Sequence, residues 1–172
     1  MSSDDFASLL PMPASRIRAI DLRIQCGANL AKHWRRLRRY GQAAHLENPS
    51  VVESFRVYPP SSEWCDAMLR PFDLGVFGPE RRKKVLISSG EIHLCPSATV
   101  GNCHYAMNPS CKPDSLQDMV LLFETKGGWN KHSGPELFTF DNHDPKGGCV
   151  LLNDGTVKFI RTAEQLRRLR WK

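Results

Sequence analysis

The sequence predicts an α+β fold, in which a long N-terminal helix packs on a small antiparallel sheet and a short helix follows the sheet. Apolar residues recur at helical spacing between residues 16 and 39, whereas short apolar runs alternate with turn residues after residue 118. One long helix followed by a series of strands is the α+β pattern. The 172 residues, of which 41% are hydrophobic, suit one domain with a sizeable core. We expect residues 1–15 to form a flexible arm and residues 16–172 to form this domain.

The long helix is expected to begin at Ser15, a suitable N-cap residue that follows two prolines. It should extend for about 25 residues and end near Gly41 or at Asn48-Pro49, because glycine and proline both terminate helices. Spacings near three, four and seven place six large apolar side chains on one face, which we expect to pack against the sheet. These residues are Ile17, Ile20, Ile24, Leu30, Trp34 and Leu37.

The region between residues 49 and 118 is rich in proline and is expected to be irregular. Within it, Ser62 can cap a short helix over residues 63–69, and residues 85–87 form a candidate strand. The sequence therefore predicts a variable loop region between the long helix and the sheet.

The sheet is expected in the last third of the chain. Asp154-Gly155 lies between two apolar runs and predicts a tight hairpin turn, in which Gly155 supplies the positive φ. Thr162 and Gln165 have the spacing of a capping box and predict a terminal helix. The expected strands cover residues 119–124, 137–140, 149–153 and 156–160.

The positive charge is concentrated in the two predicted helices. The net charge is +6, and residues 16–39 alone hold eight Arg or Lys residues and one Asp. Such a basic helix suits nucleic acid or anionic lipid, and the alternative is a helix face that is simply solvated. The candidate residues for this basic surface are Arg35, Arg36, Arg38 and Arg39.

A group of oxygen-bearing side chains surrounds the predicted hairpin and suggests a calcium site. Calcium prefers carboxylate and amide oxygens, but the same residue types also cap turns through their own backbone. We expect His143 to lie at the far end of the hairpin from Asp154, so these two residues should not share a site. The candidate calcium ligands are Asp141, Asp144, Asn153 and Asp154.

The six cysteines are expected to be mostly buried, unreactive thiols. A zinc site is an alternative, but the cysteines at 95, 103 and 111 are separated by seven residues each, and structural zinc sites usually use closer pairs. A disulfide among these three is a further alternative in an oxidising compartment. The zinc hypothesis involves His93, Cys95, Cys103, His104 and Cys111.

The sequence carries no local signature of an enzyme. It has no Gly-x-Ser-x-Gly elbow for a nucleophile, no Gly-x-Gly-x-x-Gly fingerprint and no phosphate-binding loop. We therefore expect a protein without catalytic residues.

Several short motifs, taken in order, carry a resemblance to a known family. Residues 142–160 combine a histidine, a Gly-Gly pair, an apolar strand and the Asn-Asp-Gly turn. This segment resembles the His-x9-Asp-Gly domain of a bacterial pseudopilin-like, prepilin-type processing-associated family, although ten residues separate His143 from Asp154-Gly155 here. Similar family motifs are Leu9-Leu10-Pro11, Cys26-Gly27-Ala28-Asn29-Leu30, Tyr58-Pro59-Pro60, Cys95-Pro96-Ser97 and Tyr105-Ala106-Met107-Asn108.

The resemblance implies a pilin-like fold and a structural role, as an assembly subunit of a type II secretion or type IV pilus system. The implied partners are other pilin-like subunits or envelope proteins, and some major pseudopilins hold calcium in this sheet. No apolar run exceeds the five residues 119–123, so this relative is expected to be anchorless, with no transmembrane segment. A truncated anchor would place it in the cell envelope, facing the periplasm, whereas a native start at Met1 would make it cytoplasmic. The alternative function is a soluble binding module that uses the basic helix on nucleic acid or an acidic partner.

Overall fold

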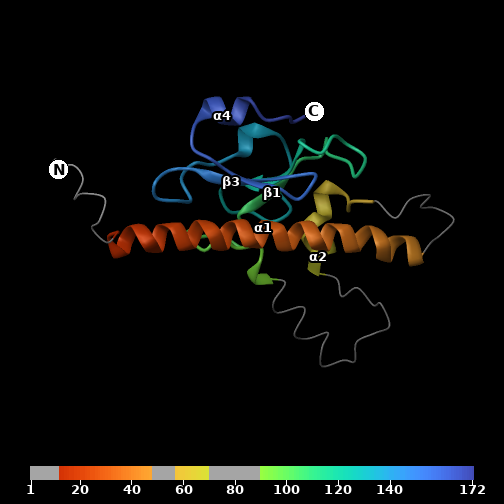
Figure 1. The fold of residues 1–172 in the computed structure, drawn as a ribbon. Helices are drawn as coiled ribbons and strands as arrows, with labels where there is room; N and C mark the ends of the chain where they lie inside the picture. Colours follow the sequence, from red (N-terminus) through yellow and green to blue (C-terminus); the bar gives the residue numbers. More distant parts are fainter. Residues whose placement is uncertain (1–11, 48–56, 70–89) are drawn as a thin grey trace, which may run out of the picture.

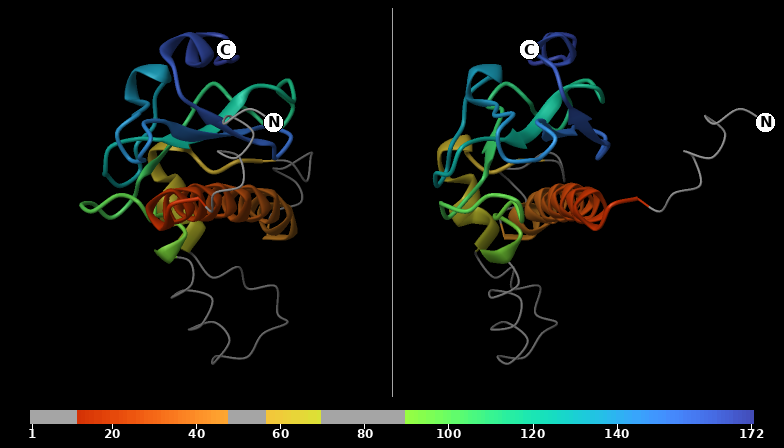
Figure 2. Two further views of the ribbon diagram at one scale, coloured as in Figure 1. Left: turned by 60° about the vertical axis from the view of Figure 1, so that its left-hand side comes forward. Right: turned by 90° about the vertical axis from the view of Figure 1, so that its left-hand side faces the viewer.

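A computed structural model of the protein describes residues 12–47, 57–69 and 90–172, which form three layers (Figure 1). Helix α1 (Ala14–Glu47) lies along one face of a four-stranded sheet, and the C-terminal segment with helix α4 (Ala163–Arg167) covers the other face (Figure 2). None of the helices in these described parts is apolar and long enough to span a bilayer.

The sheet is antiparallel throughout, with the strand order β1-β2-β3-β4. Consecutive strands are therefore neighbours, which is the simplest antiparallel arrangement. Together with the long helix it confirms the predicted α+β class. The strands are β1 (Tyr105–Met107), β2 (Val120–Glu124), β3 (Gly148–Leu152) and β4 (Val157–Ile160).

Each face of the sheet has its own core. On the α1 side, Leu30 and Leu37 are fully buried and belong to one cluster with Leu121 and Leu151 of the sheet. On the other side, Phe123 packs edge-on against Trp171, with ring centroids 5.0 Å apart. The two central strands, β2 and β3, are consequently buried along their whole length.

The predicted contact face of α1 is only partly correct. Leu30 and Leu37 are fully buried as expected, but Ile17 and Ile24 are 45% and 64% exposed. A residue advances about 100° around an α-helix, so Ile24 lies about 160° from the buried Cys26 and remains largely exposed, beside Val157 and Phe159 of β4. The buried face is a different stripe, formed by Cys26, Leu30, His33, Leu37 and Gly41.

The hairpin prediction is confirmed. Strands β3 and β4 pair in antiparallel register across Asp154-Gly155, and Gly155 has φ +94°. Trp34 of α1 lies over this turn and donates a hydrogen bond from Nε1 to the Asn153 carbonyl at 3.1 Å. The turn is therefore fixed against the helix as well as by its own backbone.

The shorter elements agree in part with those predicted from the sequence. A 3-10 turn (Ser61–Glu63) leads into helix α2 (Trp64–Leu69), close to the predicted helix over 63–69. The strand predicted over 137–140 is wrong, because Pro135–Leu137 is a 3-10 turn. Among the described residues, a single isolated bridge, from Thr125 to Phe138, joins this segment to the sheet. The Thr162 cap is confirmed, since its hydroxyl accepts a hydrogen bond from the Gln165 N–H.

The length of α1 differs from the expectation, whereas its end agrees with the second of the two predicted positions. Helix α1 begins at Ala14 and spans 34 residues, passing Gly41 and stopping just before Asn48-Pro49. The candidate strand over 85–87 and the first eleven residues of the predicted arm lie outside the described residues.

Candidate functional site

Four side chains that could bind a metal converge beneath helix α1. They are Cys26, Cys95, Glu124 and His143, and we refer to them as the four-residue cluster. One ligand atom from each lies within 4.8 Å of each of the others. All four residues are buried, with exposed fractions between 0 and 5%. The cluster lies between α1 and one end of the central strands.

Four separate parts of the fold place these side chains. Cys26 belongs to the buried stripe of α1, and Glu124 is the last residue of β2. His143 comes from the loop that leads into β3, and Cys95 from the segment that follows residue 90. That segment is attached to α1 by a hydrogen bond from Asn29 Nδ2 to the carbonyl of residue 94 at 3.0 Å.

The two ring nitrogens of His143 have different partners. Nε2 lies 3.6 Å from the Cys95 sulfur and 3.1 and 3.0 Å from the two carboxylate oxygens of Glu124. Nδ1 faces the Ser97 hydroxyl at 3.1 Å. The Cys149 N–H and the Asn142 amide donate to the Glu124 carboxylate, so its orientation is fixed too.

Electrostatics within the cluster favour charged forms of three groups. A hydrogen bond from Cys26 and a further one from His143 outweigh burial and lower the pKa of the Cys95 thiol to about 6. Burial opposes a charge on His143, but hydrogen bonds to Cys95 and Glu124 raise its pKa to about 10. Burial would raise the pKa of Glu124, yet hydrogen bonding to His143 leaves it below the ordinary value. For Cys26, burial dominates and raises the pKa.

This arrangement does not have the geometry of a nucleophilic triad. In a triad, the base uses one ring nitrogen for the nucleophile and the other for the orienting carboxylate. Here the same Nε2 of His143 faces both Cys95 and Glu124. The Cys95 sulfur is also buried, with 1% of the residue exposed. Two sulfurs, an imidazole nitrogen and a carboxylate around one point are instead the ligand types of a zinc site.

A second, smaller cluster lies nearer the C-terminal half of α1. Its members are Cys65, His93 and Cys103, all buried. The two sulfurs are 3.6 Å apart, and Cys103 Sγ lies 3.9 Å from His93 Nδ1. A hydrogen bond from Cys65 outweighs burial and lowers the pKa of Cys103 to about 5. The His93 ring packs on the His33 ring, with centroids 4.7 Å apart.

The structure thus divides the residues of the zinc hypothesis between two clusters. Cys95 belongs to the four-residue cluster, whereas His93 and Cys103 belong to the smaller one. His104 contacts the backbone, accepting from the Cys95 N–H at Nδ1 and facing the carbonyl of residue 100 with Nε2. Cys111 is buried but belongs to neither group, and all six cysteines are free thiols.

The candidate calcium ligands lie at two ends of β3. Asp141 forms ion pairs with Lys126 and Lys146 in the loop that precedes the strand. Asp154 accepts a hydrogen bond from the Thr156 N–H within the hairpin turn, as in ordinary turn capping. Asn153 binds the carbonyls of residues 112 and 115, and Asp144 precedes Pro145 in the loop before the strand. Calcium binding by these residues stays a prediction.

The family-motif residues also separate. His143 lies in the four-residue cluster, while Asp154 and Gly155 form the turn at the opposite end of the β3–β4 hairpin. This separation agrees with the expectation that the histidine and the turn do not share a site.

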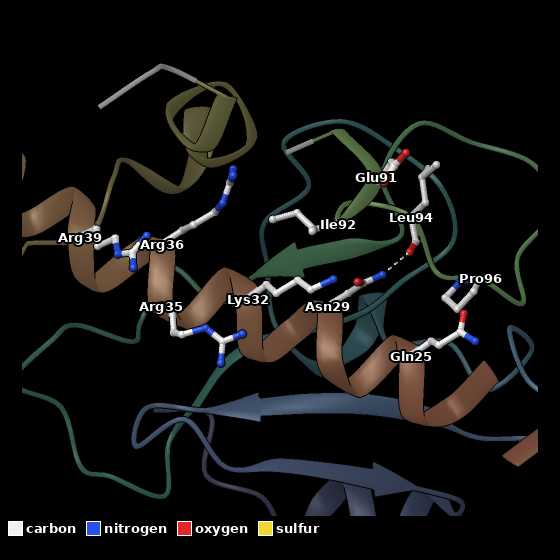
Figure 3. Close-up of a pocket in the computed structure, with 10 residues that line it drawn as sticks. All are labelled: Gln25, Asn29, Lys32, Arg35, Arg36, Arg39, Glu91, Ile92, Leu94 and Pro96. Carbon is white, nitrogen blue, oxygen red and sulfur yellow. Dashed lines mark hydrogen bonds between the residues drawn. The ribbon is translucent and has the colours of Figure 1, made fainter. Parts of the chain in front are cut away.

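The basic residues of α1 line a groove of about 490 Å³ beside the segment that follows residue 90 (Figure 3). Arg35, Arg36 and Arg39 line it together with Lys32. Arg38 points elsewhere, since its guanidinium lies 5.5 Å from the centre of the Trp34 ring. Arg36 donates a hydrogen bond to the carbonyl of Met68 at 3.0 Å, so it also holds α2 against α1.

The sequence analysis did not consider two members of the four-residue cluster, Cys26 and Glu124, as metal ligands. Cys26 lies at helical spacing with Leu30, His33 and Leu37, and counting cysteine and histidine as buried residues would have revealed this stripe. Glu124 ends an otherwise apolar strand. A buried carboxylate is unfavourable unless it is paired, so its position already indicated a partner.

Comparisons with known proteins found no relative of this chain. No protein-family model matches the sequence. No curated protein and no solved structure is significantly similar to the chain.

Proposed function

We propose that this protein is a non-enzymatic structural subunit of a pilin-like assembly, of the kind that operates in type II secretion or type IV pilus systems. The observation that carries the proposal is an exposed apolar stripe on helix α1. Ile17 and Ile24 are seven residues apart and exposed, and Ala28 and Ala31 continue the same side of the helix. Small and branched apolar residues at this spacing suit packing against a second helix.

Two further observations support a structural role. The opposite face of α1 is occupied by the sheet, so the helix can bind a partner without unfolding the domain. The four-residue cluster is buried and uses a single nitrogen of His143, which disfavours nucleophilic catalysis. The partners in this proposal are other pilin-like subunits, including further copies of this chain, and the site of action is the cell envelope.

Cross-linking tests whether the stripe packs against another copy. The six native cysteines are buried, so a cysteine introduced at Ile24 offers the accessible thiol. Leu116→Cys is a matched control, because Leu116 is 57% exposed and lies outside α1. The chain would be tethered by N-terminal lipidation to vesicles, which raises the local concentration of helices. A short bis-maleimide should then give several-fold more dimer with Ile24→Cys than with Leu116→Cys.

Equal dimer yields from the two variants at the same surface density would contradict helix packing through this stripe. Ile24→Asp provides a second measure, because a charge on an exposed residue should leave the melting temperature nearly unchanged. The same charge should abolish the cross-link when it is combined with Ile17→Cys.

A second candidate function, a binding module for nucleic acid or another polyanion, is favoured by the basic groove. Lys32, Arg35, Arg36 and Arg39 line it, and Glu91 is the acidic residue among its lining. Phosphate binding by such residues falls steeply with salt, because each contact releases a counterion. We expect affinity no tighter than about micromolar at physiological salt, the range of non-specific binding.

Fluorescence anisotropy at two salt concentrations tests this candidate with an RNA and a DNA oligonucleotide. Replacing Lys32, Arg35 and Arg39 by Gln removes charge from the groove and spares Arg36, which holds α2. Replacing Arg167, Arg168 and Lys172 by Gln removes as much charge from the C-terminal segment and is the control. Tight, salt-dependent binding lost only in the first variant would favour the binding module over the structural subunit.

A further inference from the structure

We propose that Cys26, Cys95, Glu124 and His143 bind one zinc ion, which joins helix α1 to the sheet. This site does not depend on the assembly role proposed above. It assigns a ligand to the four-residue cluster, whose side chains come from α1, the segment after residue 90, β2 and the loop before β3.

The first argument is the size of the cluster. Zinc–ligand bonds of about 2.0–2.3 Å in a tetrahedron separate neighbouring ligand atoms by about 3.3–3.8 Å. The ligand atoms of the cluster all lie within 4.8 Å of one another, and His143 Nε2 lies 3.6 Å from Cys95 Sγ. Small movements of side chains are enough to reach zinc-binding distances.

The second argument is the crowding of acceptors around one nitrogen. His143 Nε2 carries at most one proton, yet three acceptor atoms of Cys95 and Glu124 lie within 3.0–3.6 Å of it. One proton cannot satisfy all of them with good geometry. A cation at the centre of the cluster would be bound by the nitrogen, the sulfurs and the carboxylate together, because each offers it a lone pair.

The third argument is the surrounding shell. A histidine that binds zinc commonly has its other ring nitrogen fixed by a hydrogen bond, which sets the ring orientation. His143 Nδ1 faces the Ser97 hydroxyl at 3.1 Å. The carboxylate of Glu124 is held by the Cys149 N–H and the Asn142 amide. Both ligands are therefore oriented before a metal arrives.

The ligand types select the metal. Two sulfurs favour a thiophilic ion over calcium or magnesium, which prefer oxygen ligands. Two cysteinates, a carboxylate and a neutral imidazole carry three negative charges, of which zinc neutralises two. Four protein ligands in a buried setting leave no position for substrate, so the site would be structural rather than catalytic.

The smaller cluster is the natural competitor for the same ion. Cys65, His93 and Cys103 provide three ligand atoms rather than four. Hydrogen bonding does not separate the two clusters, since Cys65 Sγ accepts from the Asn130 N–H at 3.4 Å and Cys26 Sγ lies 3.1 Å from the Tyr105 hydroxyl. The number of ligands does separate them. We therefore assign the zinc to the four-residue cluster and use the smaller one as a comparison.

Metal titration of the full chain tests the assignment. The chain would be unfolded with chelator and reductant, refolded without metal, and titrated with cobalt and then zinc. One equivalent of cobalt should give the visible bands of a tetrahedral ion and a thiolate charge-transfer band, and zinc should displace it. Zinc should also raise the melting temperature by mass action, and chelator should reverse the rise.

Matched variants locate the site. Cys95→Ser should remove the cobalt spectrum and the zinc-dependent rise in melting temperature. Cys111→Ser changes a buried cysteine outside both clusters, so the cobalt spectrum and the zinc-dependent rise in melting temperature should persist. Both should also persist in Cys103→Ser, which changes the smaller cluster. Should Cys95→Ser fail to fold, Ser97→Ala keeps every ligand and should weaken zinc binding by about 10–100-fold through loss of the hydrogen bond to His143.

Absence of stoichiometric binding would overturn the proposal, and so would binding that survives Cys95→Ser and Ser97→Ala unchanged. Loss of binding in Cys103→Ser with retention in Cys95→Ser would place the metal in the smaller cluster and refute the assignment. Binding of two equivalents of metal, one of which is lost in Cys95→Ser, would support the assignment to the four-residue cluster. These measurements contain no assembly step, so their outcome is independent of the cross-linking result.

Discussion

Gly155 lies where the β3–β4 turn meets helix α1, and its replacement by alanine tests this contact. Gly155 has φ +94°, and an added Cβ would lie 2.9 Å from Cε2 of Trp34. The left-handed backbone costs a residue with a Cβ about 1–2 kcal/mol, and overpacking against the indole adds about 1–3 kcal/mol. We therefore expect Gly155→Ala to lower the free energy of unfolding by about 2–5 kcal/mol.

A double-mutant cycle with Trp34→Ala separates these two contributions. Removing the indole eliminates the steric cost and leaves the backbone strain, so Gly155→Ala should then cost only about 1–2 kcal/mol. The coupling between the two positions should be about 1–3 kcal/mol. Urea unfolding followed by circular dichroism gives all four free energies, since this signal does not depend on Trp34.

Gly90→Ala is the control for the cycle, because a Cβ there meets no described atom within 4 Å and the backbone has no positive φ. Its effect should stay within about 1 kcal/mol. If Gly155→Ala costs the same with and without the indole, the close approach of the turn to α1 is refuted.

Further expectations follow from the core, the C-terminal segment and the calcium hypothesis. Leu37→Ala should lower the free energy of unfolding by about 2–5 kcal/mol, whereas Arg35→Ala on the exposed side should lower it by less than about 0.5 kcal/mol. Equal losses in urea unfolding would show that the assigned buried face of α1 is wrong. Trp171→Ala removes the ring packed on Phe123 and should lower the free energy of unfolding by about 3–5 kcal/mol, measured by thermal unfolding. An unchanged melting temperature would contradict the core on this side of the sheet. If calcium binds through Asp141, Asp144, Asn153 and Asp154, excess calcium should raise the melting temperature and chelator should reverse it; identical melting in both would reject the site.

The parts of the fold that local sequence determines were predictable. The Asp154-Gly155 turn follows from the backbone conformation that glycine permits, and the two flanking strands pair as expected. The Thr162 cap follows in the same way from a side chain and a backbone N–H three residues apart. Each of these signals lies within a few residues of the structure that it specifies.

The errors arose where tertiary contacts decide the structure. Tyr105–Met107 is a strand of only three residues in a proline-rich region, and it is stabilised by pairing with β2 rather than by its own pattern. The segment around Phe138 and Phe140 is apolar because it packs over the second core, not because it is a strand. Apolar composition alone does not separate these two cases.

The four-residue cluster could not be found from spacing. Its members lie at positions 26, 95, 124 and 143, in four elements that meet only in the folded protein. Metal motifs detectable in sequence place ligand pairs two to four residues apart. The resemblance to the pseudopilin-like family did single out the motifs that contain Cys26, Cys95 and His143, but it gave no reason to connect these residues with one another or with Glu124.

The two proposals meet on helix α1, because they use opposite sides of it. Cys26 faces the sheet, while Ile24 lies about 160° away around the helix axis. A metal bond to Cys26 would fix the rotation of α1 relative to the sheet, since a rotation by one residue position, about 100°, would remove the sulfur from the cluster. It would thereby also fix the direction in which Ile17 and Ile24 face. Under both proposals, metal removal should broaden the cross-linking pattern of the helix even where the chain stays folded, so that cysteines at positions 17, 20 and 24 react with more similar yields.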